Sequence, residues 1–141
     1  MVLNKFRPWV LNISWVQAVA ASIGSMYVSE IAHIAPCSLC WYQRICMFPI
    51  AVILTVGIKE KNRDIAKYVL PFSITGWVIA LYQNLLIYGV ISHPIYSCTL
   101  GADCTDKGVT FLGFITFPLL SLAAFTIINI CMMIYAGNKN R

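Results

Sequence analysis

The sequence predicts an all-α integral membrane protein: a bundle of four transmembrane helices, forming a single domain over residues 1–141 with both termini in the cytoplasm. Three observations lead to this prediction. Charged residues make up only 11% of the chain and hydrophobic residues 60%, whereas a soluble domain usually carries about 25% charged residues. The hydrophobic residues gather in four long stretches. Most basic residues lie in the segments that would face one side of a membrane.

The first stretch, about residues 8–29, is free of charge between Arg7 and Glu30. It predicts a membrane-spanning helix, because roughly 20 apolar residues are needed to cross the hydrocarbon core. A cleaved signal peptide is the less favoured interpretation. The apolar part of such a peptide is only about 7–15 residues long, shorter than this stretch.

The other three stretches predict helices over about residues 39–58, 68–92 and 109–136. The second is long enough only if it begins close to Leu39. In lipid, the backbone N–H and C=O groups must be paired within the chain, so helices are expected.

The basic residues predict the orientation of these helices. With two exceptions, every Lys and Arg precedes the first helix, follows the fourth, or lies between the second and third. The exceptions are Arg44 and Lys107. Because positive loops favour the cytoplasm, the segments of about 30–38 and 93–108 should face outward. The net charge of +5 is then explained by topology, and no nucleic-acid partner is expected.

The six cysteines divide according to this topology. Two close pairs, Cys37 with Cys40 and Cys98 with Cys104, lie in or beside the outward loops, where disulfides persist. Cys46 and Cys131 fall inside predicted helices, where a thiol usually behaves as a small hydrophobic group. A redox role is therefore expected for the outward pairs.

The first pair forms a C-x-x-C motif with three possible roles. A zinc site is disfavoured, because the five residues between Cys98 and Cys104 are a poor spacing for metal ligands. A structural disulfide is also possible, but it would close a very small loop and restrict the unfolded chain little. A redox centre fits better. The positive end of a helix starting near Cys40 favours the reactive thiolate. The positive charge of Arg44, one turn later, could stabilise a thiolate or an anionic oxygen of a cofactor.

Several neighbouring residues have a simpler interpretation beside the functional one. Arg44 could be an interfacial anchor, and Trp41 is typical of the aromatic belt. His33 and His93 could tune a thiolate or could be ordinary loop histidines. Gln83 and Asn84 lie within the third apolar stretch. They could form hydrogen bonds between helices or contact a quinone.

The run PCSLCWYQR at residues 36–44 resembles the signature of the DsbB family of membrane thiol–disulfide oxidoreductases. The short second outward loop and the run GFITFP at residues 113–118 are similar to the BdbC branch, found in Gram-positive bacteria. The resemblance covers nearly the whole chain. It implies a membrane enzyme of the cell membrane, with its redox cysteines on the extracytoplasmic face, that reoxidises a DsbA-like thiol oxidase of the BdbD type.

The resemblance also implies a role for each site residue. Cys98 and Cys104 would exchange disulfides with the partner protein, and electrons would then pass to Cys37 and Cys40. Cys40 would react with a quinone, expected to be menaquinone, whose binding Arg44 promotes. The loop is shorter than in Gram-negative members; its polar flank favours Cys104 as the cysteine that attacks the partner.

Two alternatives remain beside this interpretation. A vitamin K epoxide reductase-like enzyme is also a helical-bundle thiol enzyme, but in that family the loop cysteines precede the C-x-x-C motif. The other alternative is a membrane protein without enzymatic activity, whose outer cysteines bind metal or hold the loops together.

Overall fold

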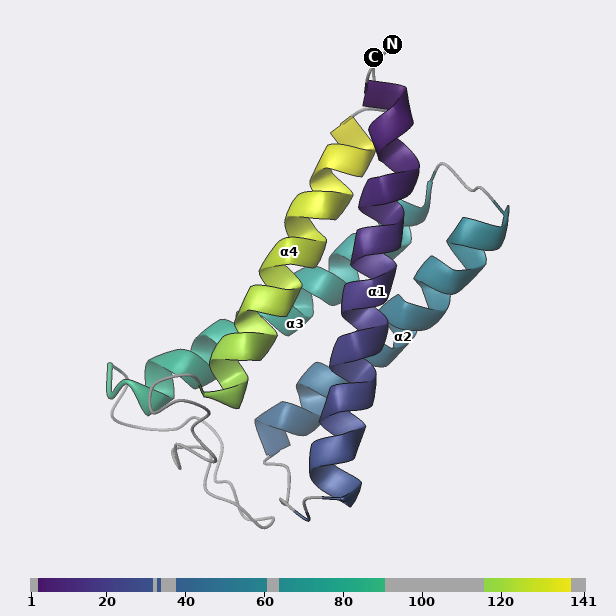
Figure 1. Cartoon of the computed structure of the whole chain (residues 1–141). Coiled ribbons are helices and arrows are strands. Elements are labelled where there is room, and N and C mark those ends of the chain that lie inside the picture. The colour runs from purple at the N-terminus through teal and green to yellow at the C-terminus, as the bar shows by residue number, and fades with distance from the viewer. Residues whose placement is uncertain (1–2, 32, 34–37, 61–63, 91–115, 138–141) are drawn as a thin grey trace.

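Four helices run alternately up and down in a computed structural model of the chain (Figure 1). The structure describes residues 3–31, 33, 38–60, 64–90 and 116–137, with side chains from residue 8 onward. Helices that follow one another in the chain pack together, and α1 closes the bundle against α4. The helices are α1 (Leu3–Glu30), α2 (Ser38–Glu60), α3 (Ile65–Ile87) and α4 (Phe117–Gly137).

The two ends of the bundle differ in what they bring together. The start of α1 and the end of α4 lie at one end, with the end of α2 and the start of α3 (Figure 1). The first turn of α2, which carries Cys40, lies at the opposite end, together with the end of α3 and the start of α4. We call this opposite end the cysteine end.

Three of the described helices, α2, α3 and α4, are long and apolar enough to cross a membrane. At 28 residues, or about 42 Å at 1.5 Å per residue, α1 has the length. Its apolar run is interrupted by Asn12, Gln17 and several serines. An all-helical membrane fold is therefore supported, while the fourth span and the cytoplasmic location of the termini stay predictions.

The predicted third helix, about 68–92, was wrong at its C-terminal end. The helix stops at Ile87 because Gly89 adopts a left-handed conformation, with φ of 72°. The Val90 N–H bonds the Leu85 carbonyl at 3.0 Å, and the Gly89 N–H bonds the Leu86 carbonyl at 3.1 Å. This pair of bonds is a Schellman motif, which satisfies the last carbonyl groups of a helix.

The fourth helix was predicted over about 109–136, but α4 begins only at Phe117; residues 91–115 lie outside the described part. Thr116 is not helical, and its carbonyl accepts the N–H groups of Leu119 and Leu120 at 3.0 and 3.1 Å. It is therefore the N-cap of α4. Pro118 follows in the first turn, where its missing N–H has no cost.

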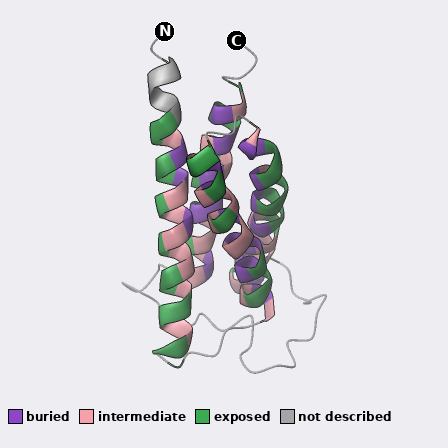
Figure 2. Ribbon diagram, turned by 90° about the vertical axis from the view of Figure 1, so that its right-hand side faces the viewer, coloured by how far each residue is buried: buried purple, intermediate pink, exposed green. Residues whose placement is uncertain are grey.

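The core of the bundle is apolar, and so is much of its outer surface. Phe125, Ile128 and Met132 of α4 are fully buried against Ile50 and Leu54 of α2 and Val69 of α3. The exposed residues face outward along the helices (Figure 2), and many are large and apolar, such as Val52, Val78 and Ile130. Lipid rather than water suits such a surface, because soluble proteins rarely expose large apolar patches.

Candidate functional site

Cys40 lies in the first turn of α2, which begins two residues earlier at Ser38. The first four N–H groups of a helix have no partner within it, and they give this end a partial positive charge. Cys40 is half-buried and packs against a small apolar cluster formed by Leu39 and Leu86, with Tyr82 at its edge. Its sulfur therefore lies between α2 and α3 at the cysteine end.

Two glutamines connect Cys40 to α3. The side-chain nitrogen Nε2 of Gln43 donates to Oε1 of Gln83 at 2.7 Å. Nε2 of Gln83 in turn donates to Sγ of Cys40 at 3.5 Å. Gln43 is 7% exposed and Gln83 2%. The interhelical hydrogen bonding proposed for Gln83 is confirmed, and its partner Gln43 is a residue that the sequence did not single out.

Arg44 is buried, only 8% exposed, and reaches across to α1. Its Nε donates to the hydroxyl Oγ of Ser25 and its Nη2 to the Ser25 carbonyl, both at 2.6 Å. The guanidinium carbon lies 5.5 Å from the centre of the Trp41 ring, within reach of a cation–π interaction. A guanidinium has five N–H groups. Ser25 takes two of them, and the other three have no partner among the described residues.

Asn84 joins α3 to the start of α4 at the same end. The Asn84 Nδ2 donates to the carbonyls of Ala80 at 2.8 Å and Pro118 at 2.9 Å. Its Oδ1 and the Thr116 hydroxyl are buried without a partner in the described part of the chain. Asn84 therefore makes the interhelical hydrogen bond that its place in an apolar stretch indicated.

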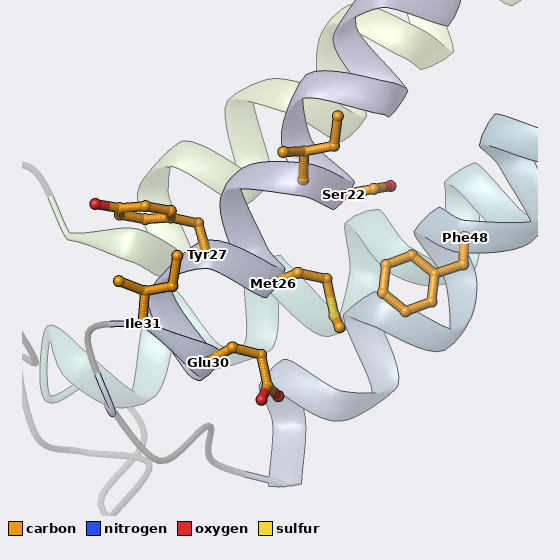
Figure 3. Close-up of a pocket in the computed structure, with 7 residues that line it drawn as sticks. Ser22, Met26, Tyr27, Glu30, Ile31 and Phe48 are labelled. Carbon is orange, nitrogen blue, oxygen red and sulfur yellow. The ribbon is translucent and has the colours of Figure 1, made fainter.

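A shallow apolar groove of about 420 Å³ lies between the last turns of α1 and the side chain of Phe48 on α2. Met26 points toward the Phe48 ring, and Glu30 lies at the end of the groove near the start of α2 (Figure 3). Ser22 is the other polar residue that lines it. The groove is open to the outer surface, where an apolar chain of a lipid-like molecule could lie.

The other residues considered from the sequence divide into two groups. Cys37, Cys98, Cys104 and His93 lie outside the described residues. His33 is exposed, with a φ of 51°, which is uncommon for a residue other than glycine. Cys46 is buried in the apolar core and Cys131 packs against it, both as free thiols. They therefore fill space, as the sequence indicated.

Ser25, like Gln43, is a residue of the site that sequence reasoning missed. Nothing in its local sequence marks it, since α1 carries several serines and the contact with Arg44 joins residues 19 positions apart. The available signal was a charged residue, Arg44, at the start of an apolar stretch. A buried guanidinium requires acceptors on a neighbouring helix.

The family model described as "Disulfide bond formation protein DsbB" matches residues 7–135. "Disulfide bond formation protein C" of Bacillus subtilis (strain 168) is 40% identical over 136 residues, covering 96% of this chain and 99% of the relative. "Probable disulfide formation protein" of Metapseudomonas resinovorans is 36% identical, with 89% and 88% covered. "Probable disulfide formation protein C" of Halalkalibacterium halodurans is 38% identical, with 89% and 92% covered. No solved structure matches the chain.

Proposed function

This chain belongs to the DsbB family of disulfide bond formation proteins, and from that premise we propose that it is a quinone-linked thiol–disulfide oxidoreductase. It is a multi-pass membrane protein. Its redox cysteines face the extracytoplasmic side of the cell membrane. There it reoxidises a DsbA-like thiol oxidase of the BdbD type and so supports disulfide formation in exported proteins.

The observation that carries the proposal is the position of Cys40. Its sulfur lies in the first turn of α2, where backbone N–H groups without a partner inside the helix favour a negative charge. It also accepts a hydrogen bond from Gln83. Since the thiolate is the reactive form of cysteine, these surroundings suit a redox-active thiol better than a purely structural one.

Arg44 is the residue that would hold the quinone beside Cys40. It follows Cys40 by four residues, and so by about one helical turn. Two of its N–H groups are bonded to Ser25, and three have no described partner. The buried guanidinium thus offers donors for a carbonyl oxygen. A bound quinone, menaquinone in a Gram-positive host, would supply the capacity to accept two electrons and two protons.

The remaining cysteines complete the relay as the family resemblance implies. The partner's dithiol is oxidised to a disulfide while the Cys98–Cys104 disulfide is reduced. The Cys98/Cys104 dithiol is then reoxidised while the Cys37–Cys40 disulfide is reduced. Each step proceeds by attack of a thiolate on a disulfide through a mixed disulfide. The reduced Cys37/Cys40 pair would then hold the two electrons and two protons that a bound quinone can accept.

The test is reduction of a menaquinone analogue by a reduced DsbA-like partner, with the full-length protein in detergent micelles. We expect Cys40→Ala to abolish the reaction. Cys131→Ala, a cysteine packed against the core, is the matched control and should retain it. Unchanged activity of Cys40→Ala would refute the proposal.

Two further measurements test which loop cysteine attacks the partner and whether the outer cysteines bind metal instead. Cys98→Ser and Cys104→Ser variants should differ in whether they trap a mixed disulfide with the partner, which identifies the cysteine that attacks it. Metal analysis of the purified protein should find no zinc held by the outer thiols. Stoichiometric zinc on Cys37, Cys40, Cys98 and Cys104 would favour a metal-binding protein instead.

A further inference from the structure

Two buried glutamine side chains connect α2 and α3 at the Cys40 sulfur. We infer that Gln83 is the hydrogen-bond donor that stabilises the thiolate of Cys40, and that Gln43 holds Gln83 in the orientation to do so. The inference deepens the proposed function and rests on it, since it concerns the reactivity of the cysteine beside the quinone.

The direction of the hydrogen bonds defines the role of each glutamine. Gln43 donates its Nε2 to Oε1 of Gln83 at 2.7 Å. This bond turns the oxygen of the Gln83 amide toward Gln43 and its nitrogen toward Sγ of Cys40, 3.5 Å away. A sulfur that receives an N–H is acting as an acceptor, which suits a thiolate. Gln43 and Cys40 lie on the same helix, so α2 supplies both the sulfur and the group that orients its donor.

Burial makes this donor effective. Gln83 is 2% exposed and Gln43 7%, so little water reaches the two amides. In such surroundings a hydrogen bond is stronger than in water, and a bond to an ionised acceptor is roughly twice as strong as a bond between neutral groups. The amide N–H of Gln83 therefore favours the thiolate over the neutral thiol.

Arg44 does not take this role in the structure. Its hydrogen bonds run to Ser25 on α1, away from the α2–α3 interface where Gln83 contacts the Cys40 sulfur. The sequence indicated Arg44 as a possible source of thiolate stabilisation. In the structure Gln83 contacts the sulfur, while the Arg44 N–H groups that have no partner among the described residues are left for a ligand.

The test measures Cys40 alone, without quinone or partner. In full-length protein with every other cysteine replaced by alanine, the rate of Cys40 alkylation by iodoacetamide is followed against pH. Gln83→Met keeps the side-chain length and removes the donor. We expect about a tenfold lower rate near neutral pH and a profile shifted upward by about one pH unit, as the loss of one hydrogen bond to a charged group predicts.

Three further variants test the assignment. Gln43→Met leaves the donor in place but unsupported, so we expect a smaller decrease of about two- to fivefold, since a neutral hydrogen bond is worth less than a charged one. Gln83→Asn, which is one methylene shorter, should behave like Gln83→Met. Gln17→Met makes the same chemical change on α1, where the side chain is half-buried. It should leave the profile unchanged.

The outcomes separate this inference from the proposed function. An unshifted alkylation profile in Gln83→Met and Gln83→Asn would overturn the inference, even if quinone reduction by the unmodified protein succeeds. A shifted profile in a protein that never reduces quinone would support the donor role and refute the proposed function. Equal shifts in Gln83→Met and Gln17→Met would assign the change to a general loss of packing and also overturn the inference.

Discussion

At the scale of single residues, Arg44 shows how a polar group is retained inside an apolar bundle. Two N–H groups of its guanidinium bond the hydroxyl and the carbonyl of Ser25, and the guanidinium lies over the Trp41 ring. Isolated charges at membrane depth are costly, and those that persist are candidates for function. The three N–H groups without a described partner are what distinguish Arg44 from a residue that only joins α1 to α2.

We predict that Arg44→Ala impairs quinone use more than folding. Loss of hydrogen bonds from a charged donor is worth about 1.5–3 kcal/mol, or roughly a 10- to 100-fold rise in the apparent KM for a quinone. Helix–helix hydrogen bonds in membranes average only about 0.6 kcal/mol, so the unfolding midpoint should change little. Quinone titrations of the variant, alongside circular dichroism, provide the measurement.

Ser25→Ala is the control for this prediction. It removes the hydroxyl acceptor and leaves the guanidinium and the carbonyl bond in place. Its effect on the apparent KM should therefore be smaller than that of Arg44→Ala. Equal affinities for quinone in the unmodified protein and in Arg44→Ala would contradict the role assigned to Arg44.

At the scale of helices, α3 and α4 approach closely where a glycine faces an aromatic ring. Gly76 of α3 is buried against the side chain of Phe125, which is fully buried on α4. A Cβ atom built on Gly76 would overlap the ring atoms of Phe125. Small residues allow membrane helices to pack closely without a hydrophobic driving force between them.

We predict that Gly76→Ala destabilises the protein by about 1–3 kcal/mol, the usual cost of overpacking. Gly24→Ala, on α1, is the matched control because nothing lies within 4 Å of its added Cβ. The control should be neutral or stabilising by up to about 1 kcal/mol, since alanine favours helix more than glycine does. Unfolding in mixed micelles measures both, and equal stabilities of the two variants would show that Phe125 moves aside at little cost.

The helices also show which features the sequence could predict. The four runs of apolar residues predict four helices. The C-x-x-C-W-Y-Q-R run carried the family resemblance, which the family match confirms. The end of α3 was misjudged because counting apolar residues passed over Gly89, whose left-handed conformation stops the helix. The bond between Gln43 and Gln83 joins residues 40 positions apart. It depends on how α2 and α3 pack, which no local pattern specifies.

At the scale of the whole molecule, the bundle gives each of its ends a distinct character. Lys59 and Lys67 are exposed near one end, where α2 finishes and α3 begins. The Cys40 cluster lies at the other. Since basic residues favour the cytoplasm, the cysteine end should face outward. The antiparallel arrangement places the start of α1 and the end of α4 together on the cytoplasmic side only if all four helices cross the membrane.

We predict that single cysteines at the two ends react from opposite sides of the membrane. Three exposed positions serve as reporters in a protein without its native cysteines: Ile31 after α1, Lys67 at the start of α3 and Tyr88 at its end. In intact cells, an impermeant maleimide should label Ile31→Cys and Tyr88→Cys. It should label Lys67→Cys only after permeabilisation, which also controls for the reactivity of each site.

Because α1 and α3 both end at the cysteine end of the bundle, labelling of Ile31→Cys from the same side as Lys67→Cys would contradict a membrane-spanning α1. Labelling of Lys67→Cys alone in intact cells would invert the whole topology and place Cys40 in the reducing cytoplasm, where a disulfide relay is disfavoured.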